Sequence, residues 1–138
     1  MQMYDGSMGG FGGSPKFPQP VFIEFLLDVA PTIREDEPRM AVLNAVKFTL
    51  ERMALGGIFD QVGGGFHRYS VDREWLVPHF EKMLYDNGQL AGLYARAAVI
   101  FEDDLFARTA RRTCEYVLRE MKYQSPEREQ GVSVAAAD

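Results

Sequence analysis

The chain has 138 residues, 46% of them hydrophobic, and a formal net charge of −5 at pH 7. This length and composition indicate one domain, residues 1–138, with a packed core, and they exclude an intrinsically disordered chain. Acidic residues outnumber basic ones, and the arginines near Arg111 and Arg112 are interspersed with acids. We therefore expect no nucleic-acid partner.

Cysteine and histidine content narrows the chemistry further. Cys114 is the only cysteine, so an internal disulfide or a two-cysteine redox site is excluded. A zinc site needs three or four ligands, whereas the chain has two histidines, which are not at HxxxH spacing, and no pair of cysteines. We therefore expect neither a metal site nor another cofactor. No window approaches about 20 apolar residues, and "MQMYDGSMGG" does not have the pattern of a signal peptide. These features predict a cytoplasmic protein without a membrane partner.

Apolar residues recur at helical spacing in four segments, which predict helices over 19–30, 37–55, 78–101 and 104–122. In the third helix, Gly88 and Gly92 are expected to permit close contact with another helix. Residues 58–77 predict a short β-hairpin or an extended loop, and residues 123–138 a polar tail. The predicted fold class is therefore all-α, built from α/α hairpins.

An internal repeat supports this organisation. "GGFGGSPKFP" (9–18) and "GGGFHRYSVDREWLVPHF" (63–80) share a Gly-Gly-Phe followed by Pro-x-Phe at the head of a helix. Phe11 and Phe66 are 55 residues apart, about the length of one helix-loop-helix unit. The repeat predicts two stacked hairpins introduced by related loops. Because the end faces of such a stack stay uncovered, we expect part of a larger ring or an oligomer such as a homodimer.

Two longer stretches carry a specific resemblance to a known family. The resemblance lies in "YDGSMGGFGGSPKFPQP", in "GGIFDQVGGGFHRYSVDREWLVPHFEKMLYDNGQL" and in the helix between them. Residues 4 to about 120 resemble the spermatogenesis-associated protein 20 type family, also described as thioredoxin-domain-containing proteins. In that family a thioredoxin-like domain precedes an α/α toroid similar to six-hairpin glycosidases and to N-acylglucosamine and cellobiose 2-epimerases.

The resemblance implies that the chain is a first slice of an (α/α)6 toroid. The thioredoxin-like domain and the remaining toroid hairpins are then its expected partners. Where the family continues with a further Gly-Gly-Phe loop, this chain reads "SPEREQGVSVAAAD", and no functional residue is expected there.

His67, His79 and Asp86 are the candidate catalytic residues. An imidazole titrates near neutrality and can transfer a proton in either direction. On the predicted third helix, His79, Lys82 and Asp86 fall at i, i+3 and i+7 and would share one face. That face could bind a polar substrate, or it could be a salt-bridged stripe that fastens the loop. Alternatively, each histidine could have a structural role alone and form a hydrogen bond to a neighbouring loop.

The candidate substrate-binding residues surround these groups in the sequence. Trp75 and Tyr69 could stack against a sugar ring, or they could only cover the hairpin. Arg68 and Asp60 could bind substrate or brace the loop as ion pairs. Lys16, in the first glycine loop, is expected to meet carboxylates of the second loop.

Two functions are compatible with these residues. In the enzymes that the family resembles, reaction occurs at the centre of the ring, where loops supply acids, bases and aromatic platforms. The first hypothesis is therefore a part of a carbohydrate-active or carbohydrate-binding toroid, inactive alone, with His67, His79, Arg68, Asp86 and Trp75 facing the cavity and a carbohydrate as ligand. The alternative is a non-catalytic helical interaction module that accompanies a thioredoxin-like domain.

Overall fold

A computed structural model describes residues 4–124 and 132–134 of the chain. These residues form four α-helices: α1 (Pro20–Val29), followed by a short 3-10 turn (Ala30–Thr32), α2 (Asp36–Leu55), α3 (Leu84–Phe101) and α4 (Asp104–Glu120). Two short strands, β1 (Lys122–Gln124) and β2 (Val132–Val134), pair antiparallel after α4. Lys122 was expected to end the fourth helix, and the remaining strand residues lie within the predicted polar tail (123–138), the rest of which falls outside the described residues.

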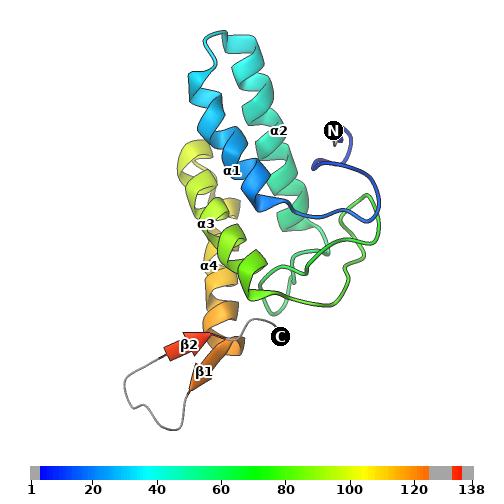
Figure 1. Ribbon diagram of the computed structural model, residues 1–138, viewed down its shortest axis with the longest axis vertical. Coiled ribbons are helices and arrows are strands. Elements are labelled where there is room, and N and C mark those ends of the chain that lie inside the picture. The colour runs from blue at the N-terminus through cyan, green and yellow to red at the C-terminus, as the bar shows by residue number, and fades with distance from the viewer. Residues whose placement is uncertain (1–3, 125–131, 135–138) are drawn as a thin grey trace.

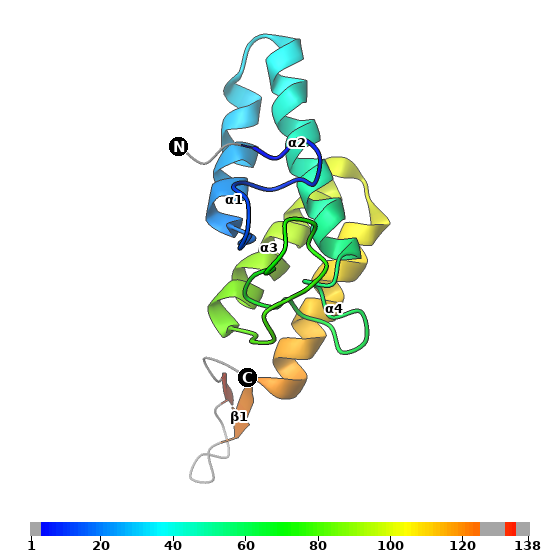
Figure 2. The same ribbon diagram turned by 90° about the vertical axis from the view of Figure 1, so that its right-hand side faces the viewer.

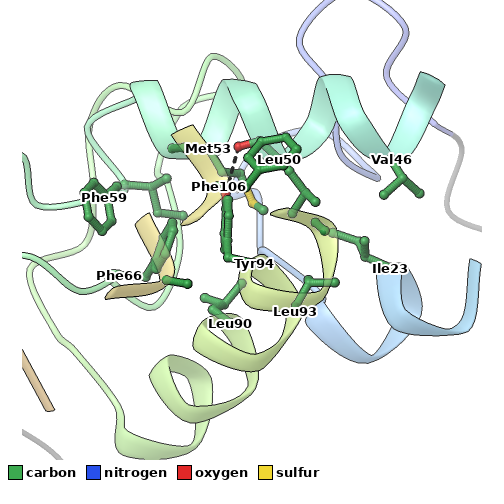
Figure 3. Close-up of a cluster of buried hydrophobic side chains, with 14 of the residues drawn as sticks. Ile23, Val46, Leu50, Met53, Phe59, Phe66, Leu90, Leu93, Tyr94 and Phe106 are labelled. Atoms are coloured by element: carbon green, nitrogen blue, oxygen red, sulfur yellow. Dashed lines mark hydrogen bonds between the residues drawn. The ribbon is translucent and has the colours of Figure 1, made fainter. Parts of the chain in front are cut away.

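The helices form two hairpins, α1 with α2 and α3 with α4, and the hairpins pack against each other (Figure 1). The hydrophobic core lies between them and includes Leu50 and Met53 of α2 and Leu90 and Tyr94 of α3. Figure 3 shows the Tyr94 hydroxyl, which donates to the carbonyl oxygen of Leu50 at 2.7 Å. The prediction of an all-α fold of stacked α/α hairpins is confirmed.

Charged side chains also join the hairpins at the edge of this core. Arg96 of α3 donates to Glu24 at 2.7 Å and to Asp28 at 2.6 Å, both on α1. These pairs are partly exposed, so they orient the hairpins more than they stabilise them. The apolar core therefore provides most of the attachment.

The loop before each hairpin lies on one side of the molecule, and the two loops run next to each other (Figure 2). Lys16 and Ser70 exchange backbone hydrogen bonds of 2.8 and 2.9 Å between the loops. Residues 58–77 contain only isolated bridges, such as Phe59 with Phe66. Of the two predicted forms, the extended loop is therefore present.

The third helix begins at Leu84 and not at residue 78 as predicted. Residues 78–83 are not helical, because the second loop uses their backbone groups. The N–H of His79 donates to Tyr69 at 2.9 Å, and the carbonyl of Glu81 accepts from Arg68 at 2.8 Å. His79 and Lys82 therefore lie before the helix, which changes the geometry expected for the site.

Gly88 and Gly92 lie on an exposed face of α3. A Cβ atom at either position would meet nothing within 4 Å, so the predicted close helix contact is not made by the described residues. The glycines instead border a groove of about 440 Å³ between α3 and α4, which Cys114 and Leu118 also line. None of the described helices combines the length and the apolar character needed to span a bilayer.

Candidate functional site

The first glycine loop is a compact turn built around Asp5. The Asp5 carboxylate accepts hydrogen bonds from the backbone N–H groups of Ser7 and Met8, each at 3.1 Å. The Asp5 backbone closes the turn, because its carbonyl accepts from Gly9 at 2.8 Å and its N–H donates to Gly10 at 2.9 Å.

The second glycine loop repeats this turn around Asp60. The Asp60 carboxylate accepts from Val62 at 2.9 Å and from Gly63 at 2.8 Å. Its backbone carbonyl accepts from Gly64, and its N–H donates to Gly65, both at 2.9 Å. The repeated motif is therefore an aspartate followed, after three residues, by Gly-Gly-Phe.

Glycine is required at the second position of each pair. Gly10 and Gly65 both have φ of +80°, a conformation that costs other residues free energy. A large aromatic ring also packs directly against each of these glycines. A Cβ atom on Gly10 would lie 2.5 Å from Trp75, and one on Gly65 would lie 2.5 Å from Tyr116.

A lysine closes each turn. The Lys82 ammonium donates to Asp60 Oδ2 at 2.9 Å and to the carbonyl of Gly64 at 3.0 Å, and it lies 4.1 Å from the centre of the Tyr116 ring. We call this arrangement the Lys82–Asp60 clasp. Burial alone would raise the pKa of Asp60, but the hydrogen bonds from Lys82, Gly63 and Val62 outweigh it and lower the pKa to about 2.

The corresponding Lys16–Asp5 clasp lies in the first loop. Lys16 Nζ donates to Asp5 Oδ2 at 2.7 Å and to the carbonyl of Gly9 at 2.8 Å, and it lies 5.2 Å from the centre of a Trp75 ring. The Lys16 side chain has no exposed surface. The prediction that Lys16 meets carboxylates of the second loop, or a substrate, is therefore wrong, because its partner is Asp5 of its own loop.

The second loop contributes Arg73 and Trp75 to the first. Arg73 binds both carboxylate oxygens of Asp5, at 2.6 and 2.8 Å, and together with Lys16 it holds the pKa of Asp5 well below its usual range. The indole N–H of Trp75 donates to the Met8 carbonyl at 3.0 Å, and the side chain is fully buried. Trp75 has no ring face free for a sugar, so it has the alternative role of covering the loop.

His67 is the buried titratable group next to the second turn. It is only 8% exposed, and its Nδ1 atom has no hydrogen-bond partner among the described residues. Burial, followed by the charge of Lys82, lowers the pKa of His67. The imidazole is therefore held in its neutral form near pH 7.

Asp86, on the first turn of α3, has a comparable carboxylate oxygen. Its Oδ2 atom is buried and lacks a hydrogen-bond partner in the part of the chain that the structure describes. Burial raises the pKa of Asp86, and the charge of Arg68 opposes this effect. The next residue, Asn87, fixes this end of α3 to the second loop. Its side-chain amide accepts from the N–H of Phe66 at 2.6 Å and donates to the carbonyl of Phe66 at 3.0 Å.

The remaining polar residues lie around these two groups. Glu81 lies 3.4 Å from Arg68 and 3.8 Å from His79 Nδ1. His79 stacks on Tyr69 with ring centres 4.7 Å apart, and Phe17 lies against Tyr69 at 4.9 Å. We define the His67 corner by these residues and their neighbours: His67, Arg68, His79, Phe80, Glu81 and Asp86.

The predicted stripe of His79, Lys82 and Asp86 on one helix face is wrong. Only Asp86 belongs to α3, and Lys82 binds Asp60. Lys82 does fasten the loop, although with a different carboxylate from the one expected. The predicted site roles of His67, His79, Asp86, Arg68 and Tyr69 stay predictions.

Sequence reasoning missed three residues of the loops. Asp5 could have been found, because an aspartate precedes the Gly-Gly pair by the same interval as Asp60 does. Phe80 and Glu81 fall within the predicted third helix, but both lie before α3; Phe80 is 82% exposed, and Glu81 lies 3.4 Å from Arg68. No three His, Cys, Asp or Glu side chains among the described residues are grouped to hold a metal ion.

Comparisons with known proteins agree with these observations. Spermatogenesis-associated protein 20 of Rattus norvegicus is 44% identical over 122 residues, which are 88% of this chain and 16% of that protein. The Homo sapiens protein of the same name matches with the same identity and coverage. The chain thus spans less than a fifth of the length of these curated relatives. No family model matches the chain.

A solved structure shares the fold. The crystal structure of a sugar epimerase from a ruminal bacterium superimposes with a TM-score of 0.72 at 19% sequence identity, over 88% of this chain and 33% of that chain. The similarity shows that the two hairpins have the fold of part of an α/α toroid. The resemblance stated from the sequence motifs is confirmed.

Proposed function

Because the chain is homologous to a segment of spermatogenesis-associated protein 20 and has the fold of part of a sugar epimerase, we propose that it forms one wall of a carbohydrate-binding cavity. One observation carries the proposal: His67 Nδ1 and Asp86 Oδ2 are buried without a partner among the described residues. Buried polar atoms in proteins normally have hydrogen-bond partners. A ligand rich in hydroxyl groups would supply both.

The side chains of His67 and Asp86 suit different tasks in such a cavity. A neutral imidazole carries one nitrogen with a free lone pair, so His67 can accept a proton or a hydroxyl hydrogen bond near pH 7. Asp86 can bind a second hydroxyl, and Arg68 supplies donors beside it. His79, which is half exposed, is a second imidazole at the entrance. We assign His67 the role of proton acceptor and the others the role of binding the sugar.

The rest of the cavity would come from other parts of a longer protein. In a toroid, loops of successive hairpins surround one central space, and this chain supplies only two of them. A thioredoxin-like domain and further hairpins are the proposed partners. The isolated chain should therefore bind sugars weakly and have no catalytic activity.

Ligand-observed NMR with a panel of mono- and disaccharides tests the proposal. His67→Gln and Asp86→Asn should each weaken sugar binding by about tenfold, since the first removes the imidazole nitrogen and the second the charge of the carboxylate acceptor. Asp104→Asn, at an exposed position on α4, is the matched control and should bind as the wild type does. If no sugar in the panel binds the wild-type chain, the proposal is wrong.

The interaction module is the second candidate, and an exposed apolar surface on α1 favours it. Val21, Phe22 and Phe25 are exposed there and line a groove of about 470 Å³. Apolar surface of this kind is typical of a face that contacts another protein. Light scattering tests self-association: a dimer that Phe25→Ser returns to monomer would support a homodimer, and a monomer at about 100 μM, an ordinary concentration for weak association, would exclude it.

A further inference from the structure

Phe80 is an exposed aromatic residue between two backbone hydrogen bonds to the second loop. Its side chain is 82% exposed, whereas Phe66 and Phe106 are fully buried in the core. The backbone on both sides of Phe80 is held, because the N–H of His79 donates to Tyr69 at 2.9 Å and Glu81 accepts from Arg68 at 2.8 Å. Keeping a phenyl ring in water is unfavourable, and nothing in the core explains its position.

The surroundings of Phe80 combine apolar and polar surface. The rings of Phe80 and His67 meet edge to face, with centres 5.3 Å apart and an interplanar angle of 81°. His67 is nine-tenths buried, and its Nδ1 atom has no partner among the described residues. An exposed aromatic ring thus adjoins a buried imidazole that has one nitrogen without a partner among the described residues.

The other aromatic residues of the two loops are all less exposed than Phe80, and the most exposed of them, Phe17, is 41% exposed. Trp75 is fully buried beneath Gly10 and Lys16. Tyr69 has neighbours in Phe17 at 4.9 Å and His79 at 4.7 Å. Phe80 is therefore the best-placed free aromatic surface beside His67 in the described loops.

We propose that Phe80 is the platform on which the C–H face of a pyranose ring stacks while the hydroxyl groups of the sugar bind His67 and Asp86. The inference rests on the proposed function and specifies its ligand class. A closed sugar ring presents a continuous apolar face to an aromatic ring, and an acyclic polyol with the same hydroxyl chemistry does not. The site thus selects ring-form sugars over open-chain polyols.

Methyl β-D-glucopyranoside and sorbitol are suitable probes, because the glycoside cannot open its ring and sorbitol has none. Their dissociation constants are measured by NMR titration for the wild type, Phe80→Ala, Phe80→Tyr and Phe25→Ala. Phe25, 55% exposed on α1, is the matched control. Since Phe80 is exposed, its truncation should leave the melting temperature nearly unchanged.

Phe80→Ala should weaken binding of the glycoside by about tenfold, Phe80→Tyr by less than about twofold, and Phe25→Ala should have no effect. Wild-type protein should bind sorbitol at least about tenfold more weakly than the glycoside. If Phe80→Ala binds the glycoside normally while His67→Gln does not, the proposed stacking on Phe80 is wrong, and the proposed carbohydrate-binding cavity still stands. Equal binding of sorbitol and glycoside also overturns the platform. If the wild type binds neither probe nor any sugar of the panel, both proposals fail.

Discussion

Lys82 and Asp60 form an ion pair of 2.9 Å that closes the turn next to His67. The pair repeats the 2.7 Å pair between Lys16 and Asp5 in the first loop, including the second hydrogen bond to a glycine carbonyl and the aromatic ring beside the ammonium. The internal repeat therefore extends from the helices to individual hydrogen bonds. The two copies differ in burial, because the Lys82–Asp60 clasp is partly open to solvent and the Lys16–Asp5 clasp is sealed.

This difference predicts that replacing Lys16 destabilises the fold more than replacing Lys82. Lys16→Met leaves a buried carboxylate with one cation fewer and should lower the free energy of unfolding by about 2–4 kcal/mol. Lys82→Met should cost about 1–2 kcal/mol, because solvent partly compensates at Asp60. Urea unfolding measures both. Lys47→Met is the control and should cost under about 0.5 kcal/mol, because the ion pairs of Lys47 are long, at 3.7 and 3.8 Å, and partly exposed. Equal losses for the two clasps would contradict the assignment.

The hairpins and the loop repeat could be predicted from the sequence because their signals are local. Helical periodicity depends on neighbouring turns, and paired glycines permit the positive φ that both Gly-Gly-Phe copies have. The start of α3 could not be predicted in this way. The apolar pattern continues upstream through Phe80, but hydrogen bonds to Tyr69 and Arg68, more than nine residues away, keep that segment out of the helix.

Glycine substitutions should separate backbone strain from steric clash. Gly65→Ala should cost several kcal/mol, because the added Cβ would lie 2.5 Å from the Tyr116 ring in addition to the cost of positive φ. Gly12, at φ of +87°, has nothing within 4 Å of its Cβ position. Gly12→Ala should therefore cost only about 1 kcal/mol, the conformational term alone. Thermal unfolding of the two variants checks this, and similar melting temperatures would show that Tyr116 moves aside.

Acid should destabilise the protein through the clasps. The pKa of Asp60 falls from 3.8 in an unfolded chain to about 2 in the fold, so its contribution is fully present above pH 3.8. That contribution, about 2 kcal/mol, is lost as the pH decreases through about 2. Asp60→Asn should therefore be less stable than the wild type at pH 6 and show a shallower loss of unfolding free energy below pH 4. Urea unfolding across this range measures the slope. Asp104→Asn should retain the wild-type slope, and an unchanged slope in Asp60→Asn would rule out the clasp as its source.

Residue types in the site were recognised from the sequence more readily than their partners. His67 and Asp86 stood out because titratable groups flank a glycine turn and a helix start. Lys16 was assigned to the wrong loop, since many carboxylates are available in the sequence and only the Asp5 turn places one beneath it. The two alternatives for Trp75, a ligand platform or a cover for the loop, stay open in the sequence because its burial depends on Gly10, 65 residues earlier. Burial and exposure are properties of the packed chain, which also explains why Phe80 was missed.

The imidazole of His67 should titrate below 6.5. Burial is the main cause, the charge of Lys82 and that of His79 act in the same direction, and Asp60 opposes them. Because the unfolded chain binds this proton more readily, His67 contributes fully to stability above pH 6.5, and the contribution decreases as the pH falls below that value. Lys82→Met should raise the pKa of His67 while leaving it below 6.5, since burial remains. NMR titration of the imidazole C–H signals measures both values, with Lys47→Met as the control that should not shift them. A His67 pKa at or above 6.5 in the wild type would remove the reason for assigning it as a proton acceptor near neutral pH.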